Sequence, residues 1–146
     1  MAGVKERTLC IIKPDAVAKK AIGEIVGMLE KEGFDILGLR MMRLTMDDAM
    51  AFYVVHKERP FYAPLAQFMA SGPVVAIALE KEDAIAALRR LMGVTDSTKA
   101  EEGTIRAKFG TDIERNAIHG SDSQESARFE IPFFFSQNDL QPRGSA

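Results

Sequence analysis

The stretch Val74-Val75-Ala76-Ile77-Ala78-Leu79 (VVAIAL) is the clearest strand pattern in the chain, and the fold prediction is built outward from it. It is a short apolar run rich in β-branched side chains, and the turn sequence Ser71-Gly72-Pro73 precedes it, so a buried strand is predicted. Thr8 to Ile12 (TLCII) is a similar run. Pro14 ends it, because proline cannot donate to a sheet ladder, and Lys13 is therefore expected at a strand end. Strands are predicted at 8–12, 34–44, 74–79 and 117–119.

Helical patterns separate these strands. Thr45, followed by Asp47 and Asp48, has the character of a helix N-cap with acids in the first turn. Helices are predicted at 22–33, 45–56, 61–70, 82–92 and 121–130. The resulting order is βαββαβ with an insertion after the second strand. It predicts an α+β protein, a ferredoxin-like sandwich in which helices pack on one face of a four-stranded antiparallel sheet.

The length of 146 residues fits a single domain, 1–146, in which residues 136–146 form a polar C-terminal tail. Cys10 is the one cysteine, and its apolar surroundings predict a buried, inert thiol. The N-terminus lacks the apolar stretch of a signal peptide, and no run approaches the roughly 18 apolar residues of a membrane span. We therefore expect a cytoplasmic protein without a membrane partner.

The charge is nearly balanced, with 19 Lys+Arg against 21 Asp+Glu and a net charge of -2. This balance gives no global attraction to nucleic acid, so a phosphate ligand would have to be met by local positive charge. Neither a P-loop nor a protein-kinase signature set is present. Lys13, Arg89 and Arg106 are the candidates for this charge, although each alone is more typical of a plain surface charge. Arg90 is predicted to be solvated.

His119 lies between a predicted strand and a predicted helix start, at the end of the long irregular stretch 94–116. Irregular stretches of this length are usually functional or disordered, and helix N-termini favour anions. Such a histidine suits attack on phosphorus or receipt of a phosphoryl group, while a structural role is the plainer alternative. A carboxylate on one ring nitrogen would direct the other nitrogen toward the substrate. Glu130 could provide it, or could be a solvated acid at a helix end.

The segment Asn116-Ala117-Ile118-His119-Gly120-Ser121-Asp122-Ser123 resembles NxxHGSDS, the active-site signature of nucleoside diphosphate kinases. Other segments resemble family segments in the same order and spacing, at 6–8, 11–17, 59–61, 71–76, 103–106 and 125–127. The resemblance covers residues 5–135. It implies a ferredoxin-like fold and transfer of the γ-phosphate of a nucleoside triphosphate, typically ATP, to a nucleoside diphosphate. It further implies a ping-pong mechanism and broad base specificity.

The resemblance also implies roles for individual residues. His119 corresponds to the phosphorylated nucleophile, Glu130 to the acid that orients it and Ser121 to a neighbouring hydrogen-bonding residue. Phe61 corresponds to the aromatic that stacks on the base, with Leu65 and Ile113 lining the base site. The implied catalytic residues are His119, Lys13, Glu130, Tyr53, Asn116 and Ser121. The implied nucleotide-binding residues are Lys13, Phe61, Leu65, Arg89, Thr95, Arg106, Ile113 and Asn116.

Mg²⁺ is the cofactor that the resemblance implies, held mainly by nucleotide phosphates and not by a protein site, as the ion's preference for substrate oxygens and retained waters suggests. A homo-oligomer is implied as well. The short tail favours a tetramer, and a hexamer is possible. The family often has prolines in the loop before the GTIR segment, whereas residues 94–103 contain none. That loop contributes subunit contacts in the family, so its effect on assembly is open.

Two other classes fit a ferredoxin-like prediction. An RNA-binding or small-molecule regulatory module is one, but the strands at 8–12 and 74–79 have no aromatic residue and the net charge is negative. A degenerate family member kept as a scaffold is the other, but neither the histidine nor its cations are missing. His56, the other histidine, is expected to have a surface or packing role.

Overall fold

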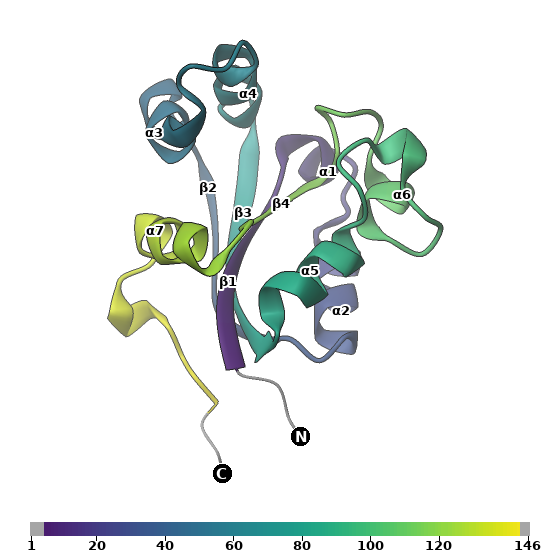
Figure 1. Cartoon of the computed structure of the whole chain (residues 1–146), viewed down its shortest axis with the longest axis vertical. Helices are drawn as coiled ribbons and strands as arrows, with labels where there is room; N and C mark the ends of the chain where they lie inside the picture. Colours follow the sequence, from purple (N-terminus) through teal and green to yellow (C-terminus); the bar gives the residue numbers. More distant parts are fainter. Residues whose placement is uncertain (1–4, 144–146) are drawn as a thin grey trace.

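The computed structural model describes residues 5–143, which build one four-stranded sheet (Figure 1). The strands are β1 (Lys5–Ile12), β2 (Asp35–Arg43), β3 (Pro73–Glu82) and β4 (Ile118–Gly120), in the spatial order β2-β3-β1-β4. All neighbouring strands are antiparallel. The predicted four-stranded antiparallel sheet of a ferredoxin-like α+β fold is therefore confirmed.

Helices cover both faces of the sheet, so the prediction of one covered face is wrong. Cys10 and Ile12 of β1 pack into one apolar cluster with α2 (Ile22–Lys31) and α5 (Ala84–Met92). Leu9 and Ile11 point to the other face, against α3 (Met46–Phe52), α4 (Tyr62–Met69) and α7 (Gln124–Phe134). The reason is visible in VVAIAL. An apolar side chain at every position needs cover on both sides of the strand.

Short elements complete the chain, and several were not predicted. Pro14 begins a brief helix, α1 (Pro14–Ala18), where the sequence indicated only a strand end. Proline suits the first helical position because its missing N–H has no helical partner there. The irregular stretch 94–116 contains η2 (Ser97–Lys99) and α6 (Ile105–Phe109). Thr104 caps α6 by accepting a hydrogen bond from the Ala107 amide.

The C-terminal segment is more ordered than a polar tail. Helix α7 continues to Phe134, and η3 (Gln137–Asp139) follows it. The Gln141 amide then donates to the Leu37 carbonyl of β2, with 2.9 Å between nitrogen and oxygen. These contacts place residues 137–141 beside the sheet, while residues 144–146 of the predicted tail lie outside the described residues. No helix within residues 5–143 has the length and apolar character needed to cross a membrane.

Candidate active site

His119 projects from β4 toward the face covered by α3. It lies opposite Ile11 in the sheet register, and two aromatic residues, the last of α3 and the one that follows it, meet its ring edge-on. The ring centroids are 5.3 Å away for Phe52 and 5.6 Å away for Tyr53. The sheet therefore holds the backbone of His119, and α3 limits the rotation of its side chain.

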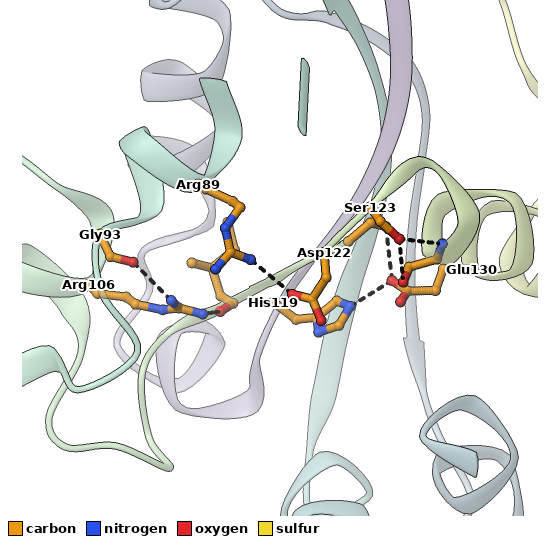
Figure 2. Close-up of polar contacts among 10 residues, drawn as sticks. Arg89, Gly93, Arg106, His119, Asp122, Ser123 and Glu130 are labelled. Carbon is orange, nitrogen blue, oxygen red and sulfur yellow. Dashed lines mark hydrogen bonds and ion pairs between the residues drawn. The ribbon is translucent and has the colours of Figure 1, made fainter. Parts of the chain in front are cut away.

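Glu130 binds one nitrogen of the His119 ring. The distance from His119 Nε2 to Glu130 Oε1 is 2.7 Å, and Ser121 Oγ donates to the same oxygen over 3.0 Å (Figure 2). The Glu130 side chain is only 13% exposed, so its interpretation as a solvated helix-end acid is wrong. Because an ionised carboxylate only accepts hydrogen bonds, it selects the tautomer with the proton on Nε2. Nδ1 then carries the lone pair and has no hydrogen-bond partner within residues 5–143.

The Tyr53 hydroxyl is buried and has no hydrogen-bond partner among the described residues. Burial, reinforced by the charge of Glu130, raises the pKa of Tyr53 above its ordinary value. The phenol therefore stays protonated at neutral pH. It can serve as a hydrogen-bond donor to a group that enters beside His119.

Lys13 follows β1 directly, and its ammonium group is buried. Its backbone N–H donates to the Ala117 carbonyl over 2.8 Å, and its Nζ donates to Asn116 Oδ1 over 2.7 Å. Burial and then the positive charge of Arg106 lower the pKa of Lys13 to about 8. The Asn116 side-chain amide also donates to the carbonyls of Thr95 and Ile113, over 3.0 and 3.2 Å. Asn116 therefore fixes the position of the Lys13 charge.

Two arginines complete the positive charge. Arg106 of α6 donates to the carbonyls of Gly93 and Ile118, over 3.0 and 2.8 Å (Figure 2). Burial and the nearby charge of Arg89 lower the pKa of Arg106 to about 10. Arg89 itself is exposed and pairs with Asp122 over 2.9 Å. Arg106 is thus fixed to backbone, while Arg89 is free to change partner.

These side chains line one cleft of about 500 Å³. Phe61, Leu65 and Ile113 supply apolar walls, and Phe61 and Ile113 remain 47% and 63% exposed. Every predicted site residue lines the cleft except Ser121 and Glu130, which lie behind His119. The predicted residues that line it are Lys13, Tyr53, Phe61, Leu65, Arg89, Thr95, Arg106, Ile113, Asn116 and His119.

Comparison with known proteins decides the family. The family model described as nucleoside diphosphate kinase matches residues 6–140. A nucleoside diphosphate kinase of Geotalea uraniireducens is 56% identical over 135 residues, which are 92% of this chain and 98% of that protein. One of Helicobacter pylori is 51% identical over 137 residues, 94% of this chain and 100% of that protein. The chain belongs to the nucleoside diphosphate kinase family.

Solved structures agree with this membership. The nucleoside diphosphate kinase of Aquifex aeolicus superposes with a TM-score of 0.92 at 52% identity, covering 94% of this chain and 99% of that one. A nucleoside diphosphate kinase of Halobacterium salinarum in complex with CDP gives 0.91 at 39% identity, covering 97% and 95%. As a member of the nucleoside diphosphate kinase family, the chain is a nucleotide-binding phosphotransferase.

The cleft of this nucleoside diphosphate kinase family member also contains residues that the sequence did not place there. His56 was expected to have a surface or packing role, yet it lines the cleft, with ring centroids 6.3 Å from Tyr53 and 5.1 Å from Phe61. Nothing in the local sequence signals this position. Asp122 does have a signal, because it lies within the resemblance segment of His119. The cleft residues outside the prediction are His56, Met92, Glu114, Gly120 and Asp122.

Met92 and Gly120 explain how α5 approaches β4 so closely. A Cβ on Gly120 would lie 2.6 Å from Met92 Sδ, so any larger residue would require the Met92 side chain to move. The side chain that closely approaches the Gly120 backbone is thus that of Met92. Within residues 5–143, no three His, Cys, Asp or Glu side chains form a group that could hold a metal ion.

Proposed function

We propose that this chain transfers the γ-phosphate of a nucleoside triphosphate, typically ATP, to a nucleoside diphosphate through a phosphohistidine at His119. The observation that carries the proposal is the arrangement of the His119 ring. Glu130 holds Nε2 at 2.7 Å, and Nδ1 is left without a partner among the described residues, in a cleft lined by three cationic side chains. A fixed neutral imidazole beside positive charge is suited to attack on phosphorus.

In the first half of the reaction, the Nδ1 lone pair forms a bond to the γ-phosphorus. The bond from phosphorus to the oxygen that bridges to the β-phosphate breaks, and the diphosphate leaves with that electron pair. Lys13 and Arg106 are placed to neutralise the departing charge. The imidazole becomes positive as the bond forms, and the Glu130 carboxylate stabilises it through the Nε2 proton.

In the second half, a terminal phosphate oxygen of the acceptor diphosphate attacks the phosphorus, and the electron pair of the nitrogen–phosphorus bond returns to Nδ1. One cleft serves both halves, so the first diphosphate has to leave before the acceptor enters. Initial rates at several fixed ATP concentrations should therefore give parallel double-reciprocal lines. Intersecting lines would indicate a ternary complex and contradict the phosphohistidine route.

We propose Mg²⁺ as the cofactor, held mainly by nucleotide phosphates. The donor set fits this ion, because the cleft offers the carboxylates of Asp122 and Glu114 beside its cations. Mg²⁺ is commonly bound by one or two carboxylates together with substrate phosphates. When bound, it would neutralise phosphate charge. Lys13, Arg89 and Arg106 would orient the same phosphates.

Phe61 supports broad base specificity, since every base has a face that can stack on an aromatic ring. Replacing Phe61 with alanine should weaken binding of all nucleoside diphosphates by about 1–3 kcal/mol, with similar losses for purines and pyrimidines. Calorimetric titration with GDP and CDP measures this. Phe129→Ala is the matched control, because Phe129 is equally exposed, at 49%, but lies on α7 outside the cleft. A loss confined to one base would contradict the stacking role.

The Lys13 charge predicts a pH dependence. Burial lowers the pKa of Lys13 to about 8, and the protonated form is the one that meets phosphate charge. The rate of phosphohistidine formation should therefore be highest below that pH and fall as pH rises through it. Arg106 has a pKa of about 10 and stays charged in this window. Rapid-quench measurements across the range test the prediction, and a rate that stays constant to the pKa of Arg106 would contradict it.

We propose that the protein forms a homo-oligomer, with a tetramer favoured. The edge strand β2 supports this. Among residues 5–143, β2 pairs only with β3, and its Leu39 and Met41 side chains are 48% and 57% exposed. Exposed apolar residues on an edge strand are typical of an association surface. Light scattering of the purified protein gives the oligomer mass, and a monomer at working concentration would contradict the proposal.

A cytoplasmic location is also proposed. Its support is Cys10, a fully buried free thiol whose pKa is raised above its ordinary value by burial.

The RNA-module alternative is disfavoured by the helices on both faces of the sheet, since RNA readers of this fold stack bases on an open sheet face.

A further inference from the structure

Ala117 has a backbone conformation that alanine rarely adopts, between the Lys13 partner Asn116 and the strand that carries His119. Its φ is 74°, and the Ile118 amide donates to the Asn116 carbonyl over 2.8 Å. A hydrogen bond from residue i+2 to residue i around such a φ forms a γ-turn, which is rare and strained for a residue with a side chain. Because Ala117 is fully buried, surrounding contacts have to hold this turn.

Those contacts come from Lys13 and Asp15, which follow β1 and bind the carbonyl and the amide of Ala117. The Lys13 amide donates to the Ala117 carbonyl over 2.8 Å. The Ala117 amide donates to Asp15 Oδ2 over 3.0 Å. The Ala117 carbonyl is thus paired with a backbone amide, and the Ala117 amide is paired with the Asp15 side chain.

The environment of the Asp15 carboxylate is unfavourable for its charged form. Its second oxygen, Oδ1, is buried without a hydrogen-bond partner within residues 5–143. Burial raises the pKa of Asp15, and the Ala117 amide and the Lys13 charge oppose that rise. A partly buried carboxylate with one unpaired oxygen costs stability, and a service to the site is a reason for the chain to retain it. Asp15 lies outside the cleft lining, so a service to the site would act through its neighbours.

We propose that Asp15 is a positioning residue for phosphoryl transfer, which locks the Ala117 γ-turn and thereby places Asn116 and Lys13 at the phosphate end of the cleft. The proposal rests on the proposed function. The turn sets where the Asn116 side chain lies, and Asn116 Oδ1 in turn holds Lys13 Nζ at 2.7 Å. The same turn leads into β4, where Ile118 pairs with Ile12 and His119 with Ile11.

Asp15 also acts on Lys13 through charge. The charged groups that act on the Lys13 ammonium are Arg106, which lowers its pKa, and Asp15 and Glu114, which raise it. Loss of the Asp15 charge should therefore lower the pKa of Lys13 further, so that its protonated form is lost at lower pH. This electrostatic effect and the mechanical lock can be separated by substitution.

The test uses Asp15→Ala, Asp15→Asn and the double variant Asp15→Ala/Ala117→Gly. Single-turnover formation of phosphohistidine from ATP and Mg²⁺ is measured for each across the pH range around the Lys13 pKa, about 8. Asp15→Ala should label roughly ten- to a hundredfold more slowly, the scale expected when a catalytic group is misplaced. Glycine adopts positive φ without strain, so Ala117→Gly should restore most of that rate without restoring the basic limb of the pH profile.

Asp15→Asn keeps an oxygen that can accept from the Ala117 amide but removes the charge. Its rate below the Lys13 pKa should stay near that of the wild type, and its basic limb should move to lower pH by roughly one unit. Glu80→Gln is the control. It removes a carboxylate that is 14% exposed and paired with Arg7, away from the cleft, and should change neither rate nor limb.

The proposal is overturned if Asp15→Ala labels as fast as the wild type, or if glycine at position 117 restores none of a lost rate. If Asp15→Ala fails to fold, Asp15→Asn decides. A folded Asp15→Asn variant that labels tenfold or more slowly below the Lys13 pKa overturns the hydrogen-bond lock, because its amide oxygen can still accept from the Ala117 amide, and an unmoved basic limb overturns the electrostatic coupling to Lys13. The failure of the proposed function is separate. It appears as a wild-type protein that is never labelled, whereas a labelled wild type with insensitive Asp15 variants removes this inference alone.

Discussion

Replacing His119 with alanine should lower the rate of phosphoryl transfer by roughly a thousandfold or more while leaving nucleotide affinity nearly unchanged. The two effects separate because different groups carry them. In the proposed mechanism His119 supplies the nucleophilic nitrogen, whereas Lys13, Arg89 and Arg106 would meet the phosphates and Phe61 the base, and all five residues line the cleft. Transfer from ATP to CDP measures the first effect, and calorimetric titration with ADP measures the second.

His56→Ala is the matched control for this substitution. His56 is the other histidine of the chain and also lines the cleft, so the pair compares two imidazoles in one site. His56→Ala should still accept a phosphoryl group, because His119, and not His56, is the histidine that is hydrogen-bonded to Glu130 in the described part of the chain. Turnover retained in His119→Ala, or lost equally in both variants, would contradict the assignment of the nucleophile.

The second large effect is expected at Lys13. Lys13→Gln keeps a group that can donate to Asn116 Oδ1 but removes the buried positive charge. We expect phosphohistidine formation to slow by roughly a hundred- to a thousandfold, the usual scale for losing a donor that stabilises developing charge in a water-poor site. The rate should also lose its fall near pH 8, since the group that titrates there is gone.

Lys31→Gln serves as the control for Lys13→Gln. Lys31 is an exposed lysine in the last turn of α2, outside the cleft lining. Its neutralisation should leave both rate and pH profile unchanged. A Lys13→Gln variant that retains the fall near pH 8 would show that another group titrates there and would remove Lys13 from the electrostatic account.

The strands and most of the residues that line the cleft could be predicted because their signals are local. VVAIAL reads as a buried strand on its own, and the segment around His119 is specific enough to indicate the family. The number of sheet faces that helices cover could not be predicted from such local signals. An apolar residue at every position from 74 to 79 is compatible with helices on both sides of β3, but only the packed chain shows which helices those are.

Contacts between distant segments could not be predicted. The hydrogen bond between Asp15 and the Ala117 amide joins residues 102 positions apart, and a left-handed alanine has no sequence signal comparable to that of glycine. His56 enters the cleft because η1 (Val54–His56) turns the chain between α3 and α4. Helical spacing alone does not reveal such a turn. The contact of Asp15 with Ala117 and the place of His56 in the cleft both depend on the tertiary structure.

The most direct test of the central claim is the mass of the wild-type protein after incubation with ATP and Mg²⁺ in the absence of an acceptor. The account predicts one added phosphoryl group that is acid-labile, maps to His119 and is discharged by GDP or CDP. A protein that binds ATP but gains no mass would contradict the phosphohistidine mechanism. An acid-stable phosphoryl group on another residue would contradict the assignment of His119.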